Sequence, residues 1–157
     1  MDPLAPRSPK VSLTEMTEIV LPQHANALGT VFGGQVLAWI DICGAVAAHR
    51  HCGKVAVTAA VDGVSFLAPI HVGDVVCLHG RVNAAFKTSL EVEVVVDVED
   101  PATTTRSRCL EALLTFVAIG EDRRPCPVPP VALEGPDDIE RHRAAVARRD
   151  ARLTTRR

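Results

Sequence analysis

The sequence lacks a strong charge of either sign, a long apolar run and any paired-cysteine motif. Its formal net charge is −2, from 17 basic and 19 acidic residues, whereas a general polyanion binder normally carries a marked basic excess. The longest apolar run, Val36–Ala48, is well short of the roughly 20 residues that cross a bilayer. Residues 1–10 contain no apolar stretch typical of a secretory signal. We therefore expect neither nucleic acid nor a membrane among the partners.

The five cysteines are odd in number and form no CxxC pair, which favours a reduced compartment and a cytoplasmic protein. His49, His51 and Cys52 are close in sequence, but a structural metal site needs four ligands in paired spacings, and no second cluster follows. No metal is predicted. The motifs GxSxG, GxGxxG and GxxxxGK[ST] are absent, so a serine hydrolase, a dinucleotide-binding protein and a P-loop protein have no support.

The composition predicts one globular domain with a basic tail. Apolar residues make up 47% of the chain and charged residues 23%, which is enough to bury a core and excludes disorder throughout. Residues 137–157 contain seven arginines and four acids, while the preceding residues carry a net negative charge. We divide the chain into a flexible N-terminus (1–10), a main domain (11–122), and a Pro-rich segment followed by a basic helix (123–157).

Apolar periodicity predicts one strand, one buried helix and then four more strands. Residues 11–21 alternate, with Val11, Leu13, Ile19 and Leu21 expected on the buried face. A loop with three glycines follows, and the segment from Gly34 to Arg50 is apolar on every side, so it is expected to be covered on every side. The four later strands are expected at Val55–Leu67, Asp74–Phe86, Leu90–Val98 and Arg106–Ile119.

Consecutive strands with short turns favour an antiparallel sheet, and one long apolar helix needs a sheet curled around it. The sequence therefore predicts an α+β fold. Five prolines between Arg123 and Pro136 predict an extended surface segment. Asp137 and Asp138 then begin a C-terminal helix whose narrow apolar seam, at Ile139, Val146 and Leu153, is expected to lie on a surface.

Asp41 is the only acidic or basic residue between Val36 and Ala48. Removing a carboxylate from water costs several kcal/mol unless it is paired or lies beside a wet cleft. Its helical neighbours are small, namely Ala38, Gly44, Ala45 and Ala48, which leaves space for a substrate channel. The same residues would also permit close helix packing around a structural carboxylate.

Other residues could also carry chemistry. Gly33 and Gly34 precede the predicted helix, where unpaired N–H groups could hold an oxyanion or merely form a tight turn. Asn26 and His24, in the same loop, could orient a reactant or cap a turn. The Lys87–Ser89 turn and the C-terminal arginines could grip phosphate or simply be solvated.

The segments HANALGTVFGGQVLAWIDICGAVAAHRHC (His24–Cys52), VTAAVDGVSFLAPIHVGD (Val57–Asp74) and VNAAFKTSLEVEVVV (Val82–Val96) resemble the hotdog-fold acyl-CoA thioesterases, specifically the cytosolic acyl-CoA hydrolase group. The resemblance extends from about Thr14 to Arg152. It implies a long central helix wrapped by a curved antiparallel sheet, and hydrolysis of acyl-CoA to free fatty acid and CoA.

The resemblance also implies roles for individual residues. Asn26 and Asp41 match the family's catalytic pair, contributed across a dimer interface, with Gly33 and Gly34 at the oxyanion. Self-association as dimers, and as trimers of such dimers, is implied. No cofactor is expected beyond the CoA of the substrate. The CoA contacts correspond to Thr58, Ala59, Ala60, Lys87, Thr88, Ser89 and an arginine, Arg148 or Arg149.

The sequence leaves three alternatives open. Asp41 could act as general base on water or attack the thioester directly. A hydratase or dehydratase of the same fold would pair a histidine with an acid, as His24 and Asp41 could. A third alternative is a non-catalytic module that senses acyl-CoA.

Overall fold

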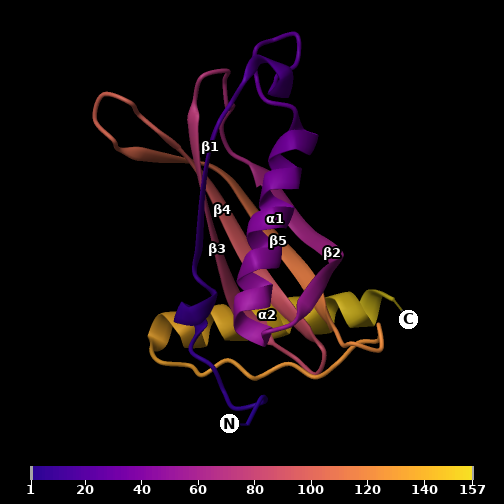
Figure 1. Cartoon of the computed structure of the whole chain (residues 1–157). Coiled ribbons are helices and arrows are strands. Elements are labelled where there is room, and N and C mark those ends of the chain that lie inside the picture. Colours follow the sequence, from indigo (N-terminus) through magenta and orange to yellow (C-terminus); the bar gives the residue numbers. More distant parts are fainter. Residues whose placement is uncertain (1, 157) are drawn as a thin grey trace.

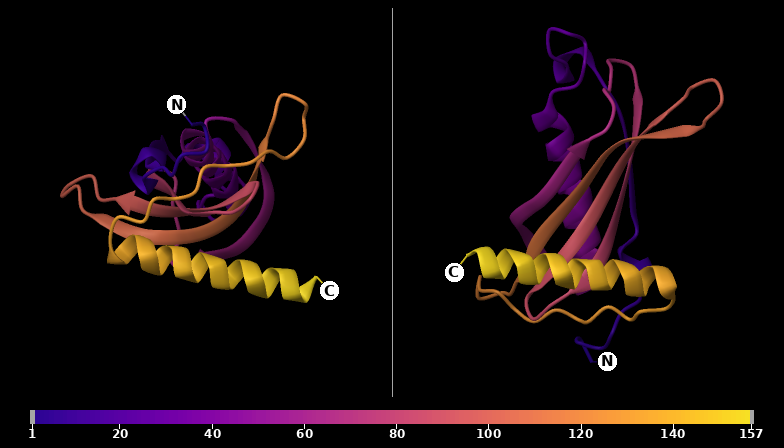
Figure 2. Two further views of the ribbon diagram at one scale, coloured as in Figure 1. Left: turned by 90° about the horizontal axis from the view of Figure 1, so that it is seen from below. Right: turned by 180° about the vertical axis from the view of Figure 1, so that it is seen from behind.

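The structure, a computed structural model, describes residues 2–156. A five-stranded antiparallel sheet in the order β1-β3-β4-β5-β2 curves around one long helix, α1, and a second helix, α2, crosses the outer face of the sheet (Figures 1 and 2). The predicted α+β arrangement is confirmed. The helices are α1 (Gly33–Cys52) and α2 (Pro136–Thr155), the short 3-10 turns are η1 (Pro9–Ser12) and η2 (Pro22–His24), and the strands are β1 (Thr14–Ile19), β2 (Val55–Phe66), β3 (Val75–Ala85), β4 (Ser89–Glu99) and β5 (Arg106–Ile119).

The core lies between α1 and the concave face of the sheet, where glycines allow a close approach. A Cβ on Gly44 of α1 would lie 2.9 Å from the Phe116 ring, and a Cβ on Gly80 of β3 would lie 3.1 Å from Cys43 Sγ. Both distances are too short for a side chain, since packed carbon atoms separate by about 3.5–4 Å. The helix can therefore rest directly on the backbone of the strands.

One face of α1 is not covered, contrary to the expectation that every side would be. Leu37, Ile42 and Val46 are each more than one-third exposed. Ile42 and Val46 are about one turn apart, and Leu37 lies one turn before the exposed Asp41, at the other edge of the same exposed half of the helix. The adjacent edge strand β2 exposes Val61 on the side of α1, where it lines a pocket with Leu37, and exposes Val57 on its other face. The apolar face of the helix therefore continues into an open apolar edge of the sheet.

The N-terminal strand is shorter than predicted and presents the opposite face. Val11 and Leu13 are about half exposed, whereas Ser12 and Thr14 are buried. The Ser12 hydroxyl donates to Pro9 O at 2.6 Å and accepts from Val82 N–H at 3.0 Å. Buried polar groups are stable when hydrogen-bonded in this way, so local hydrogen bonds override the apolar alternation.

The predicted seam of α2 is also wrong. Ile139 and Leu153 are largely exposed, and the helix faces the sheet one position away. The residues that face the sheet recur every three or four positions and are mainly charged: Asp138, Arg141, Ala145, Arg148 and Arg152. Because ion pairs rather than apolar contacts hold this face, an apolar pattern could not locate it.

The Pro-rich segment links β5 to α2 and lies against the N-terminal residues. Arg7 N–H donates to Pro130 O at 2.9 Å, and Ala132 N–H donates to Arg7 O at 2.8 Å. The Arg7 guanidinium also donates to His51 O at 2.8 Å. The division into three segments and the flexibility of residues 1–10 remain predictions.

Candidate active site

Asp41 lies on the uncovered face of α1 and contacts the neighbouring strand. The Thr58 hydroxyl of β2 donates a hydrogen bond to Asp41 Oδ1. The two side chains lie beside an open pocket of about 390 Å³. Apart from Asp41 and Thr58 its lining is apolar or small: Gly34, Leu37, Ala38, Ile40, Val61, Val64 and Leu114. A carboxylate held by a hydroxyl at the mouth of an apolar pocket can act on a polar bond attached to an apolar group.

The small residues around Asp41 divide between two environments. Ala38 lines the pocket. Gly44 and Ala48 instead are buried, and Gly44 lies against Phe116 and Val94 of the sheet. The proposed channel along small residues is therefore limited to the side of the helix that carries Ala38. Gly44 and Ala48 are small because the helix packs closely against the sheet there.

Two irregularities in β2 determine which of its residues reach the pocket. The register with β5 shifts between Thr58 and Ala60 and again between Val61 and Gly63. Each shift inserts one extra residue, a β-bulge, which reverses the alternation of faces beyond it. As a result Thr58, Val61 and Val64, which are three residues apart, all line the same pocket.

The N-terminus of α1 presents free backbone donors beside this pocket. The first backbone hydrogen bonds are donated by Gln35 and Val36 to Phe32 O, so the N–H groups of Gly33 and Gly34 precede the helical pattern. Gly34 lines the Asp41 pocket, and a Cβ there would meet no atom within 4 Å. Gly33 lines a second pocket of about 360 Å³ toward Phe66. This end of the helix can therefore hold a developing negative charge.

Asn26 lies in the loop before α1, and its side chain organises that loop. Its Oδ1 accepts from Leu28 N–H at 2.9 Å, and its Nδ2 donates to Thr30 Oγ1 at 2.8 Å. Asn26 is not among the residues that line the Asp41 pocket of the same chain. The structure thus gives Asn26 a turn-capping role within one chain and does not bring it together with Asp41 there.

His24 has structural neighbours. Its Nδ1 accepts from Leu21 N–H at 3.0 Å, and its ring packs edge-on against Trp39, with 5.1 Å between centroids. Trp39 and Asp41 lie on opposite sides of α1, because two residues turn a helix by about 200°. The structure therefore gives no support to a His24–Asp41 acid–base pair.

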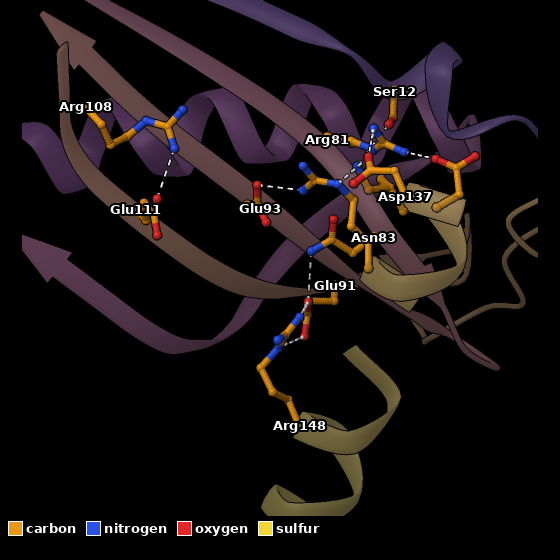
Figure 3. Close-up of polar contacts among 12 residues, drawn as sticks. Ser12, Arg81, Asn83, Glu91, Glu93, Arg108, Glu111, Asp137 and Arg148 are labelled. Carbon is orange, nitrogen blue, oxygen red and sulfur yellow. Dashed lines mark hydrogen bonds and ion pairs between the residues drawn. The ribbon is translucent and has the colours of Figure 1, made fainter. Parts of the chain in front are cut away.

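The predicted phosphate contacts lie where β3 turns into β4 (Figure 1), at the end of the sheet where Thr58 and Leu90 both pair with Phe116. Arg149 of α2 stacks over the Phe86 ring, 4.6 Å from its centroid, immediately before Lys87. Arg148 instead makes a bidentate pair with Glu91, which is 3% exposed, at 2.7 and 3.0 Å (Figure 3). Of the two arginines, Arg149 has the guanidinium that carries no carboxylate partner among residues 2–156.

Cysteine and histidine chemistry has little basis in the structure. Burial raises the pKa of the Cys43 thiol to about 11, so it is protonated near neutral pH and belongs to the core, as predicted. Within residues 2–156 no group of three or more potential ligands lies close enough to bind a metal ion. In the same residues no helix is long and apolar enough to cross a membrane.

The contact between Thr58 and Asp41 was not foreseen from the sequence, which predicted Thr58 only as a CoA contact. The available signal was a lone hydroxyl within the apolar run Val55–Val61. Nothing in that run indicates which face of the strand the hydroxyl occupies, or that a bulge follows it. Ala59 and Ala60 at this bulge, and the Lys87–Ser89 turn, remain predicted CoA contacts.

Comparison with known proteins gives a consistent result. Residues 28–105 match the Thioesterase superfamily. YkhA, an uncharacterized acyl-CoA thioester hydrolase of Bacillus subtilis, is 38% identical over 148 residues, which cover 94% of this chain and 86% of YkhA. A crystal structure of an apo-hexameric acyl-CoA thioesterase superposes with a TM-score of 0.91 at 37% identity, covering 96% of this chain and 97% of that one.

A further solved structure is the acyl-CoA hydrolase of Staphylococcus aureus in complex with butyryl-CoA, CoA and CoA disulfide. It superposes with a TM-score of 0.89 at 33% identity, covering 96% of this chain and 92% of that one. The sheet wrapped around one helix, with an acid beside a pocket on that helix, defines a hotdog-fold enzyme. The chain belongs to the Thioesterase superfamily, among its acyl-CoA thioester hydrolases.

Proposed function

We propose that this protein hydrolyses acyl-CoA to a free fatty acid and CoA at a site that two copies of the chain form together. The observation that carries the proposal is the Thr58–Asp41 hydrogen bond beside the open apolar pocket. The acyl group occupies the pocket between Leu37, Val61 and Leu114, and its thioester carbon lies next to the Asp41 carboxylate. No cofactor is needed, since CoA belongs to the substrate and the product.

Asp41 supplies the reactive carboxylate, and Thr58 fixes its orientation. With Oδ1 accepting from Thr58, Oδ2 is the oxygen available to take a proton from water or to attack the carbonyl. In the first route the water oxygen bonds to the carbonyl carbon while its proton passes to Asp41. In the second, Asp41 Oδ2 bonds to the carbonyl carbon and gives a mixed anhydride, which water then hydrolyses to the fatty acid and free Asp41. In both routes the thiolate of CoA leaves and is protonated, and one water molecule is consumed.

The backbone N–H groups at Gly33 and Gly34 stabilise the oxyanion of the tetrahedral intermediate. Loss of one such donor typically lowers turnover by about 100- to 1000-fold. Because Gly34 carries no Cβ and the space beside it is open, a carbonyl oxygen can reach these donors.

Two copies are invoked because one chain leaves the site open and incomplete. The uncovered faces of α1 and β2 are continuous and apolar, and a patch of this kind is typical of an interface. Pairing two β2 edges would also remove the unpaired edge strand. In such a dimer the Asn26 loop of one copy would orient water or the carbonyl at Asp41 of the other. Assembly of three dimers is supported by the hexameric relative.

The CoA phosphates are held at the turn between β3 and β4. Lys87, with the hydroxyls of Thr88 and Ser89, provides a cation and donors there, and Arg149 is held beside it by Phe86. Thr58, Ala59 and Ala60 border the path of the pantetheine arm. Arg148 acts mainly through Glu91, whose buried carboxylate it neutralises.

The decisive experiment measures CoA release across a series of acyl-CoA chain lengths, for wild type and for Asp41→Asn. The amide keeps the size and polarity of the side chain but can neither accept the proton nor attack. We expect turnover to fall at least 100-fold, with unchanged circular dichroism and oligomeric mass. Near-normal turnover would end the assignment. Thiol release from saturated acyl-CoA also separates hydrolysis from hydration of enoyl-CoA and from binding alone.

A further inference from the structure

Asp62 lies outside the regular pairing of β2 with β5. Val61 pairs with Leu114 and Gly63 pairs with Leu113, so two consecutive residues of β5 face a segment of β2 that has one residue more. Asp62 is this extra residue. Its side chain extends to the outer face of the sheet, although Thr58, four positions earlier, faces α1. In a regular strand, two residues four positions apart would share a face.

Both carboxylate oxygens of Asp62 are held on the outer face. Oδ1 accepts from the Arg152 guanidinium of α2 at 2.7 Å, and Oδ2 accepts from Thr115 Oγ1 of β5 at 2.8 Å. Arg152 also donates to Thr115 Oγ1 at 3.0 Å. The Asp62 and Arg152 side chains are only 13% and 20% exposed, so water screens this pair less than a surface ion pair.

We propose that the Asp62–Arg152 pair is a positioning device that fixes the second bulge of β2 and so determines acyl-chain selectivity. The inference rests on the proposed function, since it assigns the pocket beside Asp41 to the acyl group. The side chains that the bulge directs into this pocket are Val61 before it and Val64 after it. Neither Asp62 nor Arg152 lines the pocket, and both act through β2.

The physical basis is the two-residue period of a strand. If the bulge at Asp62 were lost, every residue on one side of it would turn to the other face. Val64 would then leave the pocket and Ser65 would enter it, because Gly63 and Ser65 line the outer face at present. The pocket wall would shorten and gain a hydroxyl, while the Lys87–Arg149 region, which the β3–β4 turn and α2 form, would not change.

The test compares Arg152→Ala, Asp62→Asn and the conservative Arg152→Lys with wild type. Arg143→Ala is the matched control, since Arg143 lies on the same helix and, among residues 2–156, pairs only with Glu140, and both side chains are largely exposed. Steady-state kcat and KM are measured with acetyl-CoA, butyryl-CoA and a long-chain acyl-CoA. Binding of free CoA is measured by calorimetry, and oligomeric mass by sedimentation.

We expect Arg152→Ala and Asp62→Asn to lower kcat for the preferred acyl chain by about 10-fold, because a displacement of about 1 Å can cost about 100-fold and the shift here is expected to be smaller. The chain-length preference should change, the Kd for free CoA should stay within about twofold, and Arg152→Lys should recover most of the kcat. In a Thr58→Val background, Arg152→Ala should cost less than it does alone, because both act through β2.

Three results would overturn the inference. A higher Kd for free CoA with unchanged kcat would make Arg152 a CoA contact instead. If kcat falls equally for every chain length and Arg152→Lys does not restore it, the pair only stabilises the fold. If the effects of Arg152→Ala and Thr58→Val on kcat are fully additive, the Asp62–Arg152 pair does not act through the Asp41 site. The proposed function fails on a different observation, an active Asp41→Asn variant, so the two failures are distinguishable.

Discussion

The Thr58 hydroxyl donates to Asp41 Oδ1, linking the edge strand β2 to the middle of α1. This is a direct contact between side chains that are 17 positions apart in the sequence. Asp41 Oδ2 is thus the oxygen available at the pocket, and the hydroxyl stabilises the charged carboxylate and fixes its orientation.

We predict that Thr58→Val lowers kcat by about 10-fold and that Thr58→Ser restores most of it. Valine keeps the branched shape but removes the donor, and a lost hydrogen bond to a charged group costs about 1.5–3 kcal/mol. The measurement is kcat from CoA release at saturating substrate. A valine variant with wild-type kcat would show that the hydrogen bond is not used in turnover.

Asn26 and Asp41 should complement each other between copies. Asn26→Ala and Asp41→Asn homo-oligomers should each have turnover at least 100-fold below wild type. Dimers containing one chain of each kind would have one intact site out of two, so random mixing should give about one quarter of the wild-type activity. Co-expression with two affinity tags, followed by the CoA-release assay, tests this. No recovery in the purified heterodimer would place both residues in one chain.

Arg149→Ala should raise KM for acyl-CoA by about fivefold with little change in kcat, since one cation contributes modestly to phosphate binding. The KM of the variant should also respond less to added salt, because screening acts on the lost charge. Arg143→Ala is the control for a general change in helix charge. If KM and its response to salt are unchanged, Arg149 only stacks on Phe86 and does not bind the CoA phosphates.

Arg148→Ala should destabilise the fold rather than weaken CoA binding. It would leave the Glu91 carboxylate buried, with only Asn83 Nδ2 donating to it at 3.1 Å. Since Arg148 is one-third exposed, we expect a loss of about 2 kcal/mol in unfolding free energy, below the range for fully buried pairs. Urea denaturation measures this free energy, and adding Glu91→Gln to the Arg148→Ala chain should recover part of the lost stability. A stable Arg148→Ala variant with raised KM would contradict this view.

His51 should make stability depend on pH. Burial lowers the pKa of His51, whose Nε2 lies 2.9 Å from Pro129 O, while its Nδ1 has no hydrogen-bond partner in the described part of the chain. The unfolded chain therefore binds a proton at higher pH than the folded one, so the contribution of neutral His51 is complete above about pH 6.5 and decreases as the pH falls below it. Thermal unfolding between pH 8 and pH 5 should show a smaller decline for His51→Gln than for wild type. If the unfolding temperatures of wild type and His51→Gln fall equally with pH, protonation of His51 does not contribute to the pH dependence of stability.

The sequence predicted the elements of the fold well because most of them have a strong local signal. The strand Arg106–Ile119 has the predicted bounds, and α1 was missed only at its ends. Predictions failed where polar contacts replaced apolar ones. Ser12 is buried by hydrogen bonds, and α2 is fixed by arginines such as Arg148. An apolar pattern carries no information on either.

The sequence by itself determined that one acid, Asp41, interrupts an apolar helix that begins at a glycine pair, because the cost of burying a carboxylate makes such a residue stand out. Only the tertiary structure decided what that acid contacts. Two bulges in β2 turn Thr58, Val61 and Val64 to one side, and the second is held by Asp62 from the opposite face. Bulges depend on pairing with a strand about 50 residues away, so no local pattern in β2 specifies them.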